Sequence, residues 1–201
     1  MRLIDTTTED GIAGHISSGD IVIVRGFMSA QDCESAMAEA IDHGPRMAGE
    51  ATYERGVSFL STYDGGSPIG YYRFYSGPDP ELPTLHMAYH RMRAISDAVR
   101  TTMGGGGEPG MDYHLEIFRY AKGTFFQRHT HDAEPQKVGL ICLLSRHYPG
   151  QGGTVFYAGE DSLGTAETMR QGDLVLFPWG MEHEVTLVNG DDRWVALLPY
   201  Y

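Results

Sequence analysis

Three histidines in the second half of the chain have the residue type and the spacing of metal ligands. His129 and His131 stand two residues apart in FFQRHTHDAE, and His183 follows a Gly/Pro turn in GDLVLFPWGMEHEV. Residues two apart in a strand project from the same face, so both imidazoles of the pair would point one way and Asp132 the other. Three ligands from two strands leave coordination positions open, as a catalytic metal requires.

The middle ligand has two interpretations. If the strand continues, His131 binds and the site holds three histidines, which is the alternative we favour. If the strand ends or bulges there, Asp132 turns inward and gives two histidines and one carboxylate. Glu134 is a weaker third candidate. An H-x-H pair can also arise by chance among nine histidines, and isolated histidines are usually surface or core residues.

Two helices precede the histidines. A β-branched strand at residues 20–24 leads to a helix that Ser29 and Asp32 begin and Gly44-Pro45 ends. Apolar residues at helical spacing predict a second helix over residues 82–103, which a run of glycines then stops.

Short strands must present the histidines themselves. Seven runs rich in β-branched and aromatic residues follow the glycines, separated by Gly, Pro, Asp and Asn. They cover residues 113–120, 123–129, 138–145, 153–157, 172–177, 183–188 and 193–201. The pattern predicts a mainly β protein with flanking helices (α+β), built on an antiparallel sandwich or barrel. We expect one domain over residues 1–201, with the strand, helices and an irregular segment in 1–110 and the metal-binding β core in 111–201.

Composition excludes several classes of partner. The net charge of −12 disfavours nucleic acid. The apolar runs are too short to cross a bilayer, and MRLIDTTTED lacks the apolar region of a signal peptide, so we expect a cytoplasmic protein without a membrane partner. Cys33 and Cys142 lie in apolar patterns and are expected to be buried thiols.

The order of these motifs resembles the iron(II)- and 2-oxoglutarate-dependent oxygenases, specifically their prolyl-hydroxylase-like branch. FRYAKGTFFQRHTHD is similar to the lead-in and first ligand, GLICLLSRHYPGQGGTVFY to the next strand and its turn, and RQGDLVLFPWGMEHEVTLVNGDDRW to the distal histidine and basic residue. DIVIVRGFMSAQDCESAM resembles the entry strand and first helix. The resemblance covers most of the chain, is weakest across residues 45–110, and implies a double-stranded β-helix (jelly-roll, cupin-like) core with N-terminal helices.

The resemblance also implies roles for individual residues. His129 is the first iron ligand, His183 the distal one, and Arg193 the clamp for the distal carboxylate of 2-oxoglutarate. An arginine fork can hold a carboxylate bidentately, although a surface arginine paired with Asp191 or Asp192 is the alternative. The family's acid would stand at position 131, where this sequence has His131.

The implied activity uses Fe(II), 2-oxoglutarate and O2 to oxidise a C–H bond, usually by hydroxylation, with desaturation, cyclisation or halogenation as other outcomes. The chain is short, so we expect a small-molecule substrate, such as an amino acid or a natural-product intermediate, and a monomer or homodimer. The pocket mouth is expected at residues 71–75 and 104–110, with Tyr113, His114 and Glu116 as candidate contacts.

Two other functions fit the same residues. The glycine and histidine spacing around Gly123 and Gly172 also resembles the two metal motifs of cupins, which suggests a three-histidine dioxygenase that needs no 2-oxoglutarate. A catalytically silent ligand-binding protein is the third hypothesis, because the acid position has changed.

Overall fold

The computed structural model describes residues 1–6, 11–47, 70–75, 77–104, 114–131, 138–148 and 151–198. In chain order the elements are β1 (Leu3–Thr6), α1 (Ile12–Ser17), β2 (Ile21–Val24), α2 (Ala30–Met47), β3 (Gly70–Tyr75), α4 (Pro83–Thr102), β4 (His114–Tyr120), β5 (Phe126–His129), β6 (Val138–Leu143), β7 (Thr154–Ala158), β8 (Asp161–Gly164), β9 (Leu174–Pro178), β10 (Glu182–Val185) and β11 (Arg193–Leu198).

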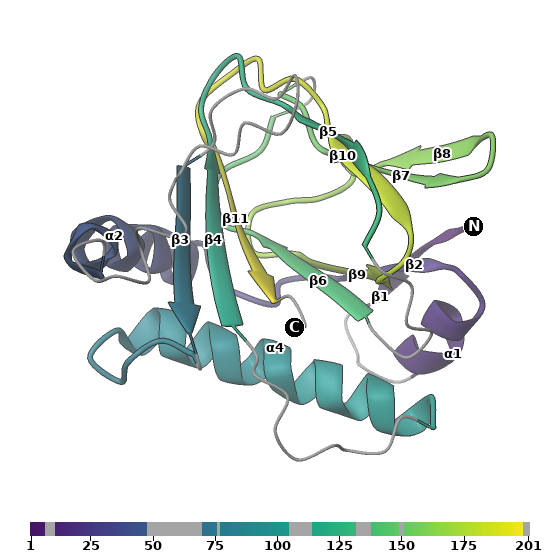
Figure 1. Ribbon diagram of the computed structural model, residues 1–201, viewed down its shortest axis with the longest axis horizontal. Coiled ribbons are helices and arrows are strands. Elements are labelled where there is room, and N and C mark those ends of the chain that lie inside the picture. The colour runs from purple at the N-terminus through teal and green to yellow at the C-terminus, as the bar shows by residue number, and fades with distance from the viewer. Residues whose placement is uncertain are drawn as a thin grey trace.

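The strands form two sheets. The larger sheet has seven strands in the order β1-β2-β9-β6-β11-β4-β3, and the smaller has four in the order β5-β10-β7-β8. Only the β1–β2 pair is parallel among the described pairings. Figure 1 shows α2 and α4 against the outside of the larger sheet, with the smaller sheet on its other side. This arrangement is a jelly roll with helices on one face, as predicted.

Period-two alternation in the larger sheet divides the core into two layers. On β11, Trp194, Ala196 and Leu198 pack into the cluster shared with the helices. Their neighbours Val195 and Leu197 belong to the cluster between the sheets. Successive strand residues point to opposite faces, so a strand buried on both sides reads as a continuous apolar run.

Most predicted elements are confirmed. All seven runs after the glycines contain a strand, and α4 matches the predicted second helix. Ser29 and Asp32 cap α2 reciprocally, through bonds from the Asp32 amide to Ser29 Oγ (3.0 Å) and from the Ser29 amide to the Asp32 carboxylate (3.3 Å). The predicted end of α2 was wrong, because the helix continues through Gly44-Pro45 to Met47. A proline removes one main-chain hydrogen bond, which this helix accommodates close to its end.

The segment at residues 71–75, expected at the pocket mouth, is a strand. It forms β3, the edge strand that pairs with β4. Tyr72 stacks on Trp194 with ring centroids 6.0 Å apart and packs against the cluster under the helices, so it faces away from the space between the sheets.

Two further sequence-based expectations concern the cysteines and membrane spans. Cys33 and Cys142 are both buried and free, as predicted. Among the helices that the structure describes, none has the length and apolar content needed to span a bilayer.

Glu39 of α2 supplies the cap that the start of α4 lacks. Its carboxylate accepts hydrogen bonds from the amides of Thr84 (3.0 Å) and Leu85 (2.8 Å), whereas Leu82 at the N-cap position offers no side-chain bond. We predict that Glu39→Ala lowers the free energy of unfolding by about 1–2 kcal/mol, since two helix-end amides lose their acceptor.

Chemical denaturation of both variants measures this effect. The control is Glu34→Ala on the same helix, whose half-exposed carboxylate pairs only with the exposed Arg146 at 3.3 Å and should matter by less than about 0.5 kcal/mol. Equal losses in the two variants would contradict the capping role.

Candidate metal centre

His129 and His183 lie directly opposite each other on neighbouring antiparallel strands. His129 ends β5, His183 is the second residue of β10, and the two are register partners. Their ring centroids are 4.3 Å apart. The β5–β10 pairing also contains an irregularity between His183 and Val185, a feature common beside active sites.

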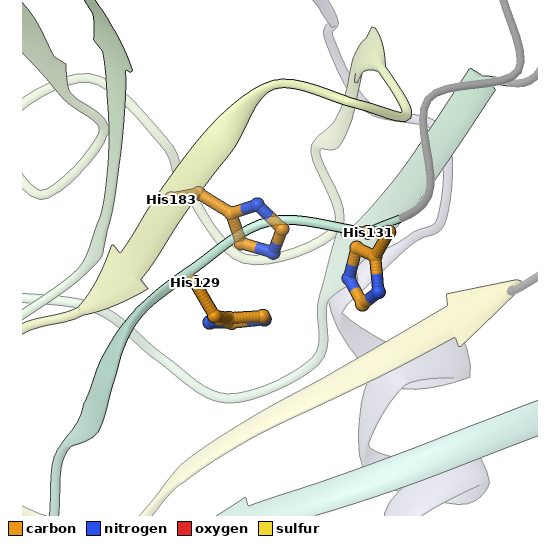
Figure 2. A group of neighbouring side chains, drawn as sticks. All are labelled: His129, His131 and His183. Atoms are coloured by element: carbon orange, nitrogen blue, oxygen red, sulfur yellow. The ribbon is translucent and has the colours of Figure 1, made fainter.

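His131 completes the group from just beyond the end of β5. Its ring centroid lies 5.1 Å from that of His129 and 5.3 Å from that of His183. One ligand atom from each of the three side chains lies within 4.8 Å of the others, and Figure 2 shows the three rings gathered at one point. Metal–imidazole bonds of about 2.0–2.1 Å bring such atoms within reach of a single ion after small ring rotations.

The backbone orients two of these rings. Nδ1 of His129 lies 2.8 Å from the carbonyl oxygen of Gln127, and Nδ1 of His183 lies 2.9 Å from that of Met181. A carbonyl only accepts, so each Nδ1 carries the proton and each Nε2 is the unprotonated nitrogen, whose lone pair is the one that can bind a metal. Ligating histidines usually have such a partner on the second nitrogen.

Burial keeps these imidazoles neutral. It lowers the pKa of His129, and burial, followed by the nearby His129, lowers the pKa of His183 to about 3. The neutral form is the one that binds metals, so His129 and His183 need no deprotonation near neutral pH.

Besides the histidines, Arg193 places a charged side chain on the inner face of the larger sheet, between the two sheets. It is only 2% exposed, and its Nη2 donates to Thr154 Oγ1 at 3.0 Å while the guanidinium lies 5.5 Å from the Tyr120 ring centroid. Burial lowers the pKa of Arg193. Within the described part of the chain, no carboxylate lies at ion-pair distance from this guanidinium. A buried cation of this kind is costly without a counter-charge, so the position suits an anionic ligand.

The alternative interpretation of Arg193 as a surface residue is wrong. Asp192 pairs with Arg119 at 2.6 Å instead. Two glycines bring the partner of Arg193 into place: Gly152 has φ +94°, and a side chain on it would meet the Leu187 carbonyl oxygen at 2.5 Å, while one on Gly153 would meet the Ala166 backbone at 2.8 Å.

Strand register sets the spacing between the histidines and Arg193. On β7, Thr154 touches Arg193, and Phe156 is the register partner of His183. Two strand residues span about 7 Å. Arg193 and His183 therefore contact two successive inward-facing residues of one strand, an arrangement that suits a ligand with two anionic groups.

Other predicted residues have mixed outcomes. His114 and Glu116 are buried on the inner face of β4, in alternation with Leu115 and Ile117 on the helix side. Leu187, in the predicted strand at residues 183–188, lies beyond the end of β10 and is 47% exposed. Asp132, Glu134, Tyr113 and residues 105–110 lie outside the described residues.

The sequence analysis gave no role to Trp179, Tyr120 or Thr154. The Trp179 ring stacks on His131, with centroids 4.1 Å apart and planes 14° apart. Tyr120 and Thr154 lie inside the sequence motifs that resemble the oxygenase family, so the sequence did contain a pattern that includes them. The contact of Trp179 with His131 depends on the folded turn and has no such pattern.

The sequence matches no protein-family model and no curated protein. Solved structures are similar to this fold. A prolyl-4-hydroxylase from Pseudomonas putida is 16% identical, with a TM-score of 0.70 over 96% of this chain and 98% of that chain. A prolyl hydroxylase from Trichoplax adhaerens, in complex with a hypoxia-inducible-factor peptide, is 14% identical, with a TM-score of 0.64 over 96% and 88%.

The non-heme α-ketoglutarate-dependent epimerase SnoN from nogalamycin biosynthesis is 16% identical, with a TM-score of 0.65 over 96% of this chain and 82% of that chain. These likenesses confirm the predicted fold, which is the jelly roll of the 2-oxoglutarate/Fe(II) oxygenases in its prolyl-hydroxylase-like form.

Gly139 of β6 allows an aromatic ring to lie beside the histidines. A Cβ there would stand 2.3 Å from the tip of the Phe177 ring, which lies 5.1 Å from the His183 ring. We predict that Gly139→Ala lowers the free energy of unfolding by about 1–3 kcal/mol, because the fully buried ring has no room to retreat.

Thermal or chemical denaturation tests this prediction. Gly164→Ala on β8 is the matched control, since its Cβ would only contact Val155 at 3.7 Å, and we expect a change within about 0.5 kcal/mol. A Gly139→Ala protein as stable as that control would show that the ring shifts freely.

Proposed function

We propose that the protein is an Fe(II)- and 2-oxoglutarate-dependent oxygenase that uses His129, His131 and His183 as metal ligands. One observation carries the proposal: a buried arginine with no carboxylate partner among the described residues contacts Thr154, which lies two residues along β7 from Phe156, the register partner of His183 in the convergent histidine group. The residues therefore offer a cation to each end of 2-oxoglutarate. The fold of the neighbouring structures supports the same assignment.

The chain would contribute binding and orientation. His129 and His183 present Nε2 because the backbone holds the Nδ1 protons. Arg193 and Thr154 would hold the distal carboxylate of 2-oxoglutarate, and Phe156 and Phe177, both fully buried, exclude water on the inner side of His183. When bound, iron, 2-oxoglutarate and O2 supply the oxidation of a C–H bond, with 2-oxoglutarate converted to succinate and CO2.

The substrate we favour is a small molecule, such as an amino acid or a natural-product intermediate, and the outcome we favour is hydroxylation. The fold accommodates other choices: the Trichoplax neighbour holds a peptide, and SnoN is an epimerase.

Anaerobic addition of Fe(II) and 2-oxoglutarate to metal-free protein tests the proposal. We expect the visible charge-transfer band of a chelated complex, lost in His131→Ala and retained in Asp132→Ala, because the imidazole at 131 already converges with the other two. Loss only in Asp132→Ala would instead give a two-histidine, one-carboxylate site. An iron-loaded wild type without a band would refute the proposal.

Two alternative functions make different predictions in that case. A cupin-like three-histidine dioxygenase would consume O2 with its own substrate regardless of 2-oxoglutarate. A silent binding protein would bind iron or 2-oxoglutarate without producing succinate.

Arg193 provides a second test. We predict that Arg193→Gln weakens 2-oxoglutarate binding about 30-fold or more, since a buried charged partner is lost. Pyruvate, which lacks the distal carboxylate, should bind the variant and the wild type equally. Anaerobic titration of the charge-transfer band measures both affinities.

Arg119→Gln is the control for general charge effects, because this exposed arginine pairs with Asp192. If Arg193→Gln weakened pyruvate and 2-oxoglutarate equally, the distal carboxylate would have another partner.

A further inference from the structure

One turn contacts both segments that carry the three histidines. Residues 178–181 join β9 to β10, and the Met181 amide closes the turn on the Pro178 carbonyl at 2.8 Å. The Met181 carbonyl holds Nδ1 of His183 at 2.9 Å, and the Gly180 carbonyl accepts from Thr130 Oγ1 at 2.9 Å. The segment between His129 and His131 is therefore tied to the same turn that orients His183.

His131 depends on this turn more than its two companions do. β5 ends at His129, so no strand pairing fixes position 131. Trp179 instead covers one face of the His131 ring, with centroids 4.1 Å apart and planes 14° apart, and Trp179 is itself only 6% exposed. A ring held on one face by a buried indole can rotate little, and its edge stays directed toward the other two histidines (Figure 2).

We infer that Trp179 is a positioning residue that fixes His131 as the third metal ligand. The inference rests on the proposed function, since it requires a metal at the three histidines. Its physical basis is preorganisation: an imidazole that is already oriented loses less freedom when it binds, and supporting contacts of this kind tune metal affinity. The stacked indole thus takes over the role that strand geometry plays for His129.

Co(II) titration of metal-free protein tests the inference without reference to activity. We expect Trp179→Met, which keeps apolar bulk but lacks a flat face, to weaken Co(II) binding about 10- to 100-fold. Trp179→Phe should stay near the wild type. The double variant Trp179→Met/His131→Ala should bind no more weakly than His131→Ala alone, because both changes remove the same ligand.

A spectroscopic count of ligands accompanies the titration. In the Co(II) protein, paramagnetically shifted proton resonances of the ligand N–H groups should number three in the wild type and in Trp179→Phe, and two in Trp179→Met. Trp194→Phe is the control, because Trp194 packs in the cluster on the helix side of the larger sheet, and it should also give three. A Trp179→Met protein with three resonances and wild-type affinity would overturn the inference.

Failure of the proposed function gives a different result. In that case the wild type itself would show no Co(II) binding that depends on His129 and His183. A wild type with two resonances, both unchanged by His131→Ala, would remove His131 from the ligand set and the inference with it, while leaving the metal site.

Discussion

The position of β10 between β5 and β7 is the constraint on which the whole site depends. Its register places His183 opposite His129 on one side and opposite Phe156 on the other. Side chains alternate along a strand, so a slip of one residue would turn His183 out of the core and bring a glutamate in. The same register keeps Thr154 two residues from Phe156, and with it the contact to Arg193. One strand thereby sets both the ligand geometry and the distance to the buried cation.

The larger sheet determines the direction in which the Arg193 side chain points. Trp194, Ala196 and Leu198 must face the helices, and this pattern turns Arg193 inward at the start of β11. A lone arginine on a surface pairs with any nearby acid, but here the adjacent Asp192 is taken by Arg119. The fold thus holds a desolvated guanidinium that favours an anionic partner, and the adjacent histidines restrict which anions can reach both points.

Local patterns in the sequence were sufficient for much of this arrangement. Runs rich in β-branched and aromatic residues predicted the seven strands of the second half. Residue type and spacing predicted the grouping of His129, His131 and His183, whereas only the family resemblance pointed to Arg193. The elements missed were α1, β1, β3 and β8, which lie outside the seven runs and outside the two predicted helices. The contact between Trp179 and His131 could not be predicted from the sequence either. It joins the turn between β9 and β10 to the residues after β5, which are far away in the sequence.

In the proposed three-histidine site, His131 would make the buried Arg193 more important for ligand choice. A carboxylate ligand would neutralise part of the charge of a divalent metal, whereas three neutral imidazoles leave that charge intact. A five-carbon dicarboxylate placed between the histidines and Arg193 would then meet a positive group at each end. Electrostatics within a buried site are weakly screened, so the substitution shifts the balance toward dianions and away from monoanionic 2-oxo acids. The loss of the acid and the burial of Arg193 therefore act in the same direction on ligand choice.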